Sequence, residues 1–158
     1  MQANVCNAFW LYDPLDPPAK YRDGDFSEEI DIFEIFGQPL REEHKRVFFA
    51  TVHRHETPYV ESIVNSRKTP LPNYSAKLKM PFDFHADFHV YGLLWTPQEL
   101  KWFVDGKEVF ARANDYFKRP LHVVFDAEIM EKWVGLPAAA DLPATFYVDY
   151  VRVWKKAD

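Results

Sequence analysis

The 158-residue sequence has little cysteine, no run of basic residues and no long apolar segment. Its one cysteine, Cys6, excludes an internal disulfide and fits a reducing compartment as well as a secreted bacterial protein. No apolar run approaches the roughly 20 residues of a membrane-spanning helix, so a membrane is not an expected partner. Residues 1–10 do not join a basic segment to an apolar one, as a signal peptide would. The net charge of −5, without a basic patch, argues against nucleic acid as a partner.

Helical periodicity is also scarce, whereas aromatic residues are abundant. Phe, Tyr and Trp occur 14, 8 and 5 times and make up 17% of the chain. This is more than a core of this size requires, and surplus aromatic side chains often line a groove. The length suits one domain with a substantial hydrophobic core, so we expect a single domain over residues 1–158.

Short runs rich in β-branched and aromatic residues, separated by Pro, Gly and Asp, predict an all-β fold. The strongest local signal lies in residues 99–110, ELKWFVDGKEVF, where Asp105 and Gly106 supply a two-residue hairpin turn. Many short strands joined by turns predict an antiparallel sandwich or barrel. The segments expected to form strands are NAFWLY, EEIDIFEIF, RVFFATVHR, SAKLKM, FHVYGLLW, ELKWFVD, KEVFAR, LHVVFDAEI and TFYVDYVRVW.

Residues 27–37, SEEIDIFEIFG, place four carboxylates among five large apolar side chains. In a regular strand Glu29 and Asp31 would share one face, while Glu34 would join the isoleucines on the other. An unpaired carboxylate in the core is very unfavourable. A β-bulge that adds one residue between Asp31 and Glu34 removes the conflict, because it turns Glu34 to the face of the other two acids.

The bulge is expected at Ile32 or Phe33, and bulges are frequent beside active sites. Three carboxylates then lie in a row, and like charges at this spacing raise the pKa of at least one of them. A pair of carboxyl groups, one ionised and one protonated, is what glycoside hydrolysis requires. The fourth acid, Glu28, is then structural or solvated. A strand end with solvated acids is the competing interpretation, and it leaves the alternation with isoleucine unexplained.

Other motifs in the sequence compete with this interpretation. His53 and His55 share one strand face, a spacing found in zinc sites, but no third ligand follows at a convincing distance along the chain. His85 and His89 are expected at the surface or in packing. Cys6 lacks a partner base that would make its thiol a nucleophile.

The segment EIDIFE, from Glu29 to Glu34, resembles the bulged Glu-x-Asp-x-x-Glu signature of glycoside hydrolase family 16, found in its laminarinases, agarases, porphyranases and carrageenases. AFWL resembles the stretch before the family's catalytic strand, DFHVYGLLWTPQELKWFVDGKEV its long sheet hairpin, and FYVDYVRVW its C-terminal strand. These matches run from Ala8 to the end of the chain in the family's order.

The resemblance implies an antiparallel jelly-roll β-sandwich with a substrate cleft across its concave sheet. It implies an endo-acting, retaining glycosidase in which Glu29 is the nucleophile, Asp31 the assisting carboxylate and Glu34 the general acid and base. It also places Trp10 and His53 in sugar subsites. A polysaccharide is the implied partner, and no cofactor is required.

The resemblance covers the C-terminal portion of the family's catalytic domain, because members carry several strands before the segment that matches AFWL. We therefore expect a second chain or an oligomer to supply strands, since open sheet edges favour aggregation. Asp149 matches a ligand of the structural calcium ion in many members, although that ion's N-terminal ligands are not among the matched residues. The resemblance suggests a secreted or periplasmic bacterial protein.

Residues 121–154 most resemble the family members that act on the red-algal galactans agar and porphyran. Two side chains there are expected to contact sugars, Glu128 by a hydrogen bond and Trp133 by stacking, or else to be solvated and to cover a loop. A sulfated galactan would need guanidinium groups in the cleft. The candidates for these groups are Arg22, Arg54 and Arg67.

Several alternatives stay open at the level of sequence. Laminarin or mixed-linkage β-glucan is an alternative substrate. A truncated, non-catalytic carbohydrate-binding protein on the same sandwich is an alternative function, although both catalytic glutamates are present. A purely structural sandwich would leave the three carboxylates and the aromatic residues unexplained.

Overall fold

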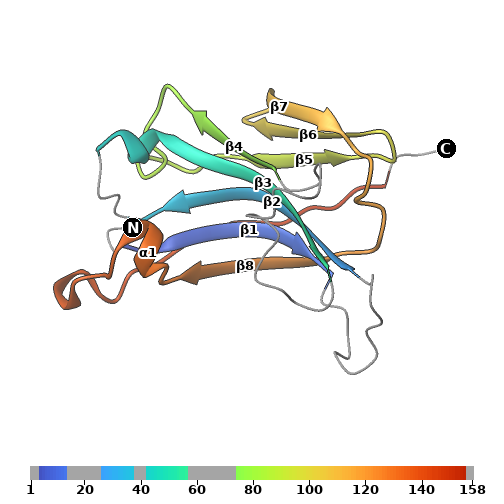
Figure 1. Cartoon of the computed structure of the whole chain (residues 1–158). Coiled ribbons are helices and arrows are strands. Elements are labelled where there is room, and N and C mark those ends of the chain that lie inside the picture. The colour runs from blue at the N-terminus through green and yellow to red at the C-terminus, as the bar shows by residue number, and fades with distance from the viewer. Residues whose placement is uncertain (1–3, 14–25, 38–41, 57–73, 156–158) are drawn as a thin grey trace.

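The computed structural model describes residues 4–13, 26–37, 42–56 and 74–155, which form two antiparallel β-sheets that pack face to face (Figure 1). The larger sheet has the strand order β4-β3-β2-β1-β8, and the smaller sheet has the order β5-β6-β7. This confirms the predicted all-β sandwich. The strands are β1 (Cys6–Tyr12), β2 (Phe26–Phe36), β3 (Val47–Glu56), β4 (Tyr74–Lys79), β5 (Tyr91–Trp95), β6 (Glu99–Val104), β7 (Lys107–Ala113) and β8 (His122–Glu128).

Helical structure in the described residues is limited to short elements. These are two 3₁₀ helices, η2 (Glu42–Arg46) and η4 (Ala139–Asp141), and one α-helical turn, α1 (Glu131–Val134). No helix in this part of the chain has the length and apolar character needed to span a membrane. The strands therefore position the functional side chains.

The core lies between the two sheets, and strand alternation decides which side chains enter it. On β6 the side chains of Leu100, Trp102 and Val104 are 0–2% exposed. They pack against the apolar face of the larger sheet, to which β2 contributes Ile30 and Ile32. Burying a side chain of this size contributes about 1.5–3 kcal/mol, so this layer supplies much of the stability of the sandwich.

The hairpin between β6 and β7 forms where the sequence predicts it. Asp105 and Gly106 both have positive φ angles, 50° and 77°. A two-residue turn with positive φ at both positions matches the right-handed twist of the flanking strands, and Asp-Gly tolerates this conformation well. The turn sets the first pairs of the β6–β7 ladder, Val104 with Lys107 and Phe103 with Glu108.

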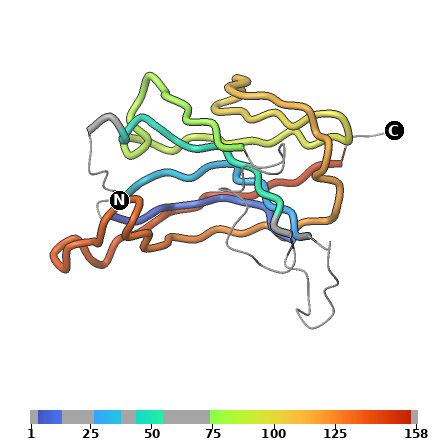
Figure 2. Tube along the Cα trace, in the orientation of Figure 1, coloured from blue at the N-terminus to red at the C-terminus, as the bar shows by residue number. Residues whose placement is uncertain are grey.

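The predicted C-terminal strand is wrong, because no strand is assigned in residues 143–155. The segment runs along the sandwich, as the red end of the tube in Figure 2 shows, and Phe146 packs against Phe33 with ring centroids 6.2 Å apart. Its other large apolar side chains are mostly exposed, up to 80% at Val153. Alternation and β-propensity show that a segment suits a sheet, but a strand also needs a hydrogen-bonding neighbour. The described residues provide none for this segment.

Candidate active site

The central strand β2 contains the bulge that the sequence predicts. Against β1, Phe33 pairs with Phe9 and Asp31 pairs with Trp10, so Ile32 is one extra residue between two consecutive pairs. Pairing with β3 is interrupted at the same place, between Asp31 and Glu34. Ile32 and Phe33 are each 4% exposed and both enter the core. The bulge therefore returns Glu34 to the face of Asp31, as expected.

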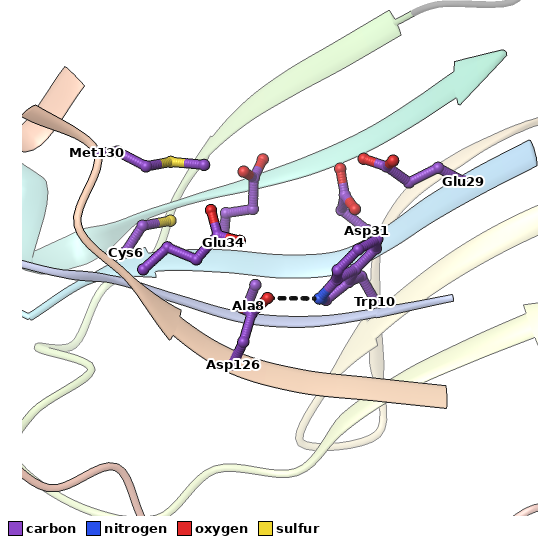
Figure 3. Close-up of a pocket in the computed structure, with 9 residues that line it drawn as sticks. Cys6, Ala8, Trp10, Glu29, Asp31, Glu34, Asp126 and Met130 are labelled. Carbon is purple, nitrogen blue, oxygen red and sulfur yellow. Dashed lines mark hydrogen bonds between the residues drawn. The ribbon is translucent and has the colours of Figure 1, made fainter. Parts of the chain in front are cut away.

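The three predicted carboxylates share one face of the larger sheet. Glu29, Asp31 and Glu34 lie in a row along β2 in Figure 3 and open into a pocket of about 220 Å³. β1 and β8 supply the other polar walls of this pocket. Its lining consists of Cys6, Ala8, Trp10, Glu29, Asp31, Glu34, Asp126, Glu128 and Met130.

Side chains from the neighbouring strands hold this row of acids. On β3, Thr51 donates a hydrogen bond from Oγ1 to Oε2 of Glu34 at 3.1 Å. His53 lies directly opposite Glu29, and its Nε2 is 3.6 Å from Oε1 of Glu29 and 3.5 Å from Oδ2 of Asp31. Cross-strand pairing thus places His53 beside Glu29 and Asp31, on the face of the sheet where the sequence predicts it.

Trp10 also lies where it was predicted, on the cleft side of β1. Its Nε1 donates to Oδ2 of Asp126 on β8 at 3.1 Å, the dashed line in Figure 3. Ala8 and Asp126 are opposite each other in the register of these strands. The hydrogen bond fixes the indole beside Asp31, which gives the pocket a flat aromatic wall suited to a sugar face.

The electrostatics of the row favour retained protons on two of its acids. The pKa of Glu34 is raised to about 8, mainly by burial and next by the charge of the neighbouring Asp31. The hydrogen bond from Thr51 opposes this rise but is a smaller effect. Burial, followed by the charges of Glu29 and Asp126, raises the pKa of Asp31 well above its ordinary value. Glu29 is more exposed, with 18% of its side chain accessible. The site therefore joins a protonated acid at Glu34 to an accessible carboxyl group at Glu29.

Trp102 contributes to the site from the opposite sheet, which the sequence did not reveal. Its Nε1 donates to the backbone carbonyl of Asp31 at 2.9 Å, across 71 residues of sequence. The bulge interrupts strand pairing next to this carbonyl, and a buried carbonyl without a partner would be costly. Trp102 therefore anchors the bulge to the second sheet. No local pattern could identify this contact.

Glu28, the remaining acid of the segment, is structural rather than solvated. Its side chain is 1% exposed, and Oε2 accepts hydrogen bonds from the backbone N–H groups of Lys118 and Arg119 at 3.1 and 3.2 Å. Burial raises the pKa of Glu28, and the two backbone donors oppose this rise. The carboxyl thus connects β2 to the segment before β8, on the opposite face from the pocket.

Glu128 and Trp133, the two residues predicted to contact sugars within residues 121–154, occupy different environments. Glu128 is exposed and lines the pocket. Trp133 packs edge-on against Phe36 and Phe49, with ring centroids 4.8 and 5.0 Å away, and is 39% exposed. Part of the Trp133 surface thus stays accessible beyond the end of the row of acids. Their contacts with sugar stay predictions.

Of the other predicted groups, only Arg54 can be placed relative to the row of acids in the described residues. Arg54 follows His53 on β3 and points to the other face, where its guanidinium lies 5.4 Å from the ring centroid of Tyr116. Arg22 and Arg67 fall outside the described residues. Asp149 is exposed and belongs to no cluster of potential metal ligands in the described part of the chain, so its calcium role stays a prediction.

Cys6 lines the pocket, but its chemistry does not suit catalysis. The thiol is buried, and burial with the nearby carboxylates raises its pKa far above the ordinary value. Since the thiolate is the reactive form, Cys6 is inert at neutral pH. The prediction that Cys6 is not a nucleophile agrees with this environment.

Known proteins with similar sequences or folds include enzymes that act on several β-glycans. The chain is 27% identical to the κ-carrageenase of Pseudoalteromonas carrageenovora in an alignment 163 positions long, which covers 96% of this chain and 40% of the carrageenase. It is 33% identical to glucan endo-1,3-β-glucosidase A1 of Niallia circulans in an alignment 88 positions long, which covers 46% of this chain and 13% of that protein. The fold matches porphyranase B of Zobellia galactanivorans with a TM-score of 0.66 and 20% identity. That match covers 91% of this chain and 54% of the porphyranase.

These relatives are longer than the chain, and the matches cover only part of each of them. The chain spans about half the length of the κ-carrageenase and porphyranase B chains that it matches. A family model described as the GH16 domain of β-porphyranases A–D matches residues 1–156, almost the entire chain. The bulged strand with Glu29, Asp31 and Glu34 lies inside this match. The chain therefore belongs to the β-porphyranase A–D family of glycoside hydrolase family 16 domains.

Proposed function

We propose that the chain carries the catalytic residues of an endo-acting, retaining glycoside hydrolase that cleaves a β-linked polysaccharide. One observation carries this proposal. The bulge in β2 places Glu29, Asp31 and Glu34 on one face of the sheet, and the pKa of Glu34 is raised to about 8. An acid that holds its proton at neutral pH, beside a second accessible carboxyl group, is the pair that retaining hydrolysis needs.

In the proposed reaction Glu29 attacks the anomeric carbon while Glu34 gives its proton to the leaving glycosidic oxygen. The bond to the leaving sugar breaks, and a covalent glycosyl ester forms on Glu29. Glu34, now a carboxylate, removes a proton from a water molecule that attacks the same carbon. The ester bond breaks, Glu29 is regenerated, and the two inversions give net retention.

Asp31 has a supporting part in this scheme. It lies between the two glutamates on the same face, and burial raises its pKa, which favours its protonated form. A protonated Asp31 adds no negative charge next to the nucleophile and has a proton to donate to it. His53 and Trp10 flank the acids from β3 and β1, which suits contacts with the sugar bound at the point of cleavage.

For the substrate we propose a red-algal galactan, either agar or porphyran. The family model that matches the chain is described by β-porphyranases, and the fold resembles porphyranase B. The pocket offers an indole wall at Trp10 and hydrogen-bonding acids at Asp126 and Glu128. Aromatic faces next to polar groups suit pyranose rings, which have apolar faces and polar edges.

Release of reducing ends from agarose, porphyran, κ-carrageenan and laminarin would test the proposal. We expect release from porphyran or agarose by the wild-type protein and a loss of at least about 1,000-fold for Glu29→Gln. Glu108→Gln, on the exposed side of β7, is the matched control and should keep wild-type activity. A proton NMR time course that shows the α-anomer forming first would contradict a retaining mechanism on a β-linkage.

A β-glucan is the second candidate substrate, because 46% of the chain aligns at 33% identity with the Niallia circulans glucanase. Release from laminarin alone would establish this alternative. Retention on agarose beads without release from any polysaccharide would instead favour a non-catalytic carbohydrate-binding protein.

A further inference from the structure

Three potential metal ligands from neighbouring strands converge in the cleft. Glu29 and Asp31 of β2 and His53 of β3 each offer one ligand atom, and these atoms lie within 4.8 Å of one another. In the described part of the chain, no other set of three His, Cys, Asp or Glu side chains does so. In the sequence, the pair His53 and His55 has a spacing found in zinc sites but lacks a third ligand at a convincing distance along the chain. The structure instead places the partners of His53 on the adjacent strand.

The separations between these atoms suit a tetrahedral ion. Zinc binds imidazole nitrogen and carboxylate oxygen at about 2.0–2.2 Å, so two ligands of a tetrahedral site are about 3.4 Å apart. Nε2 of His53 is 3.6 Å from Oε1 of Glu29 and 3.5 Å from Oδ2 of Asp31. Small side-chain rotations would therefore complete three ligand bonds, and the fourth position would face the open pocket.

We propose that Glu29, Asp31 and His53 form an inhibitory site for zinc or a similar divalent transition metal ion. The ligand set of one imidazole and two carboxylates is one that zinc accepts. Both Glu29 and His53 are 18% exposed, so an ion can reach them from the cleft. The metal would not take part in catalysis.

The ligand set also predicts which ions will bind. Calcium takes six to eight oxygen ligands, and magnesium requires octahedral oxygen coordination and keeps several waters. A site with one nitrogen and two carboxylates on a rigid sheet offers neither arrangement. Imidazole instead favours zinc, copper and nickel over calcium and magnesium. We therefore expect the site to bind zinc and cobalt and to ignore calcium.

The inhibitory consequence rests on the proposed function, whereas metal binding itself does not. A coordinated Oε1 of Glu29 cannot attack an anomeric carbon, and the ion would occupy space needed by the sugar. Metal and substrate should therefore compete.

Isothermal titration of the 158-residue protein with zinc chloride would test the site directly, and cobalt absorption would report the geometry. We expect one ion per chain and the intense visible bands of tetrahedral cobalt. His53→Asn should weaken zinc binding on the order of 100-fold, because loss of a ligand should cost at least as much as loss of a residue that only orients one. Two controls should bind zinc as the wild type does. They are His122→Asn, an exposed imidazole on β8, and Cys6→Ala, the thiol that lines the pocket.

Each outcome has a definite meaning. Absence of zinc binding at millimolar concentration, or equal affinity in His53→Asn and the wild type, would overturn the site. Asp31→Asn provides a second test if His53→Asn fails to fold, and wild-type affinity in that variant would also overturn it. Zinc binding by a protein that hydrolyses no polysaccharide would uphold the site and refute the proposed function. Hydrolysis unaffected by saturating zinc and by chelator would refute the inhibition.

Discussion

The two sheets of the sandwich differ in how completely their strands are paired. In the larger sheet β1, β2 and β3 each lie between two other strands. In the described part of the smaller sheet only β6 does, and residues 143–155 pair with neither sheet. Ile30, in the middle of the paired region, is 0% exposed, whereas Val153 is 80% exposed.

This contrast explains why the site is well defined although the chain matches only half of its longer relatives. The position of each proposed catalytic carboxylate depends on pairing of β2 with β1 and β3, and all three strands belong to the larger sheet. The smaller sheet contributes its apolar layer and one specific contact, the hydrogen bond from Trp102 to Asp31. The arrangement of the acids therefore depends little on whether residues 143–155 acquire a neighbour.

Substitutions in the two regions should differ most in their effect on stability. Ile30→Ala removes a fully buried side chain and should lower the free energy of unfolding by about 2–5 kcal/mol. Val153→Ala, at a largely exposed position, should change it by less than about 0.5 kcal/mol. Urea unfolding followed by circular dichroism measures both. Similar losses of unfolding free energy in the two variants would show that residues 143–155 are covered in solution. The difference in burial between this segment and the larger sheet would then not hold.

The acidic face of the larger sheet should reduce stability at high pH. Glu34 has a pKa of about 8 in the folded protein, against an ordinary 4.5. Between these values the unfolded chain has lost a proton that the folded protein retains, so this group contributes less stability as the pH rises. Glu34→Gln mimics the protonated form. It should match the wild type at pH 4 and exceed its unfolding free energy by about a few kcal/mol at pH 9.

Urea titrations of the variant and the wild type at pH 4 and pH 9 isolate the contribution of Glu34 to the unfolding free energy. Titrating groups that are unaffected by the substitution contribute equally to both proteins. Glu108→Gln, exposed on β7, serves as the control and should show no such pH-dependent difference. If Glu34→Gln were equally destabilised at both pH values, the high pKa of Glu34 would be wrong.

The bulge could be predicted from sequence because a local conflict demanded it. Strict alternation would have buried Glu34 beside Ile32, and one extra residue was the simplest arrangement that kept the isoleucines in the core. The hairpin turn at Asp105 and Gly106 was likewise encoded by adjacent residues with a particular backbone preference. Both predictions depend on residues only a few positions apart.

Contacts between distant segments were beyond such reasoning. The bond from Trp102 to Asp31 spans 71 residues, and the bonds from Lys118 and Arg119 to Glu28 span 90 and 91. The wrong prediction of a strand at 145–154 has the same origin, because its pattern suits a strand but does not show whether a hydrogen-bonding partner exists. The sequence therefore predicted which side chains share a face of a strand. It could not predict which distant segments pack against or hydrogen-bond to that strand.

Trp102 connects the two sheets, so its removal should affect both stability and catalysis. Trp102→Phe keeps most of the apolar volume but leaves the buried carbonyl of Asp31 without its indole donor. We expect a loss of about 1–3 kcal/mol in unfolding free energy. We also expect a decrease in kcat of roughly tenfold or more, because small displacements of catalytic groups are costly.

Trp95→Phe is the matched control on the neighbouring strand β5. Its Nε1 donates to the backbone carbonyl of Phe117 at 2.7 Å, away from β2. Because Asn114 Nδ2 also donates to that carbonyl, at 2.8 Å, the variant should cost less stability than Trp102→Phe and should not lower kcat. Equal kcat values for the two variants would show that Trp102 only stabilises the fold and does not position Asp31.

The smallest expected effect concerns the hydrogen bond between Thr51 and Glu34. This bond lowers the pKa of Glu34, because Thr51 donates to the carboxylate form, so Thr51→Val should raise that pKa. The alkaline limb of kcat/KM, which reports the proton on the free enzyme's acid, should then move to higher pH by about one unit or less. Ser75→Ala removes the neighbouring hydroxyl that bonds to Thr51 but not to Glu34, and it should leave the limb in place. A limb that moves to lower pH in Thr51→Val, or that moves equally in Ser75→Ala, would mean that Glu34 does not supply the catalytic proton.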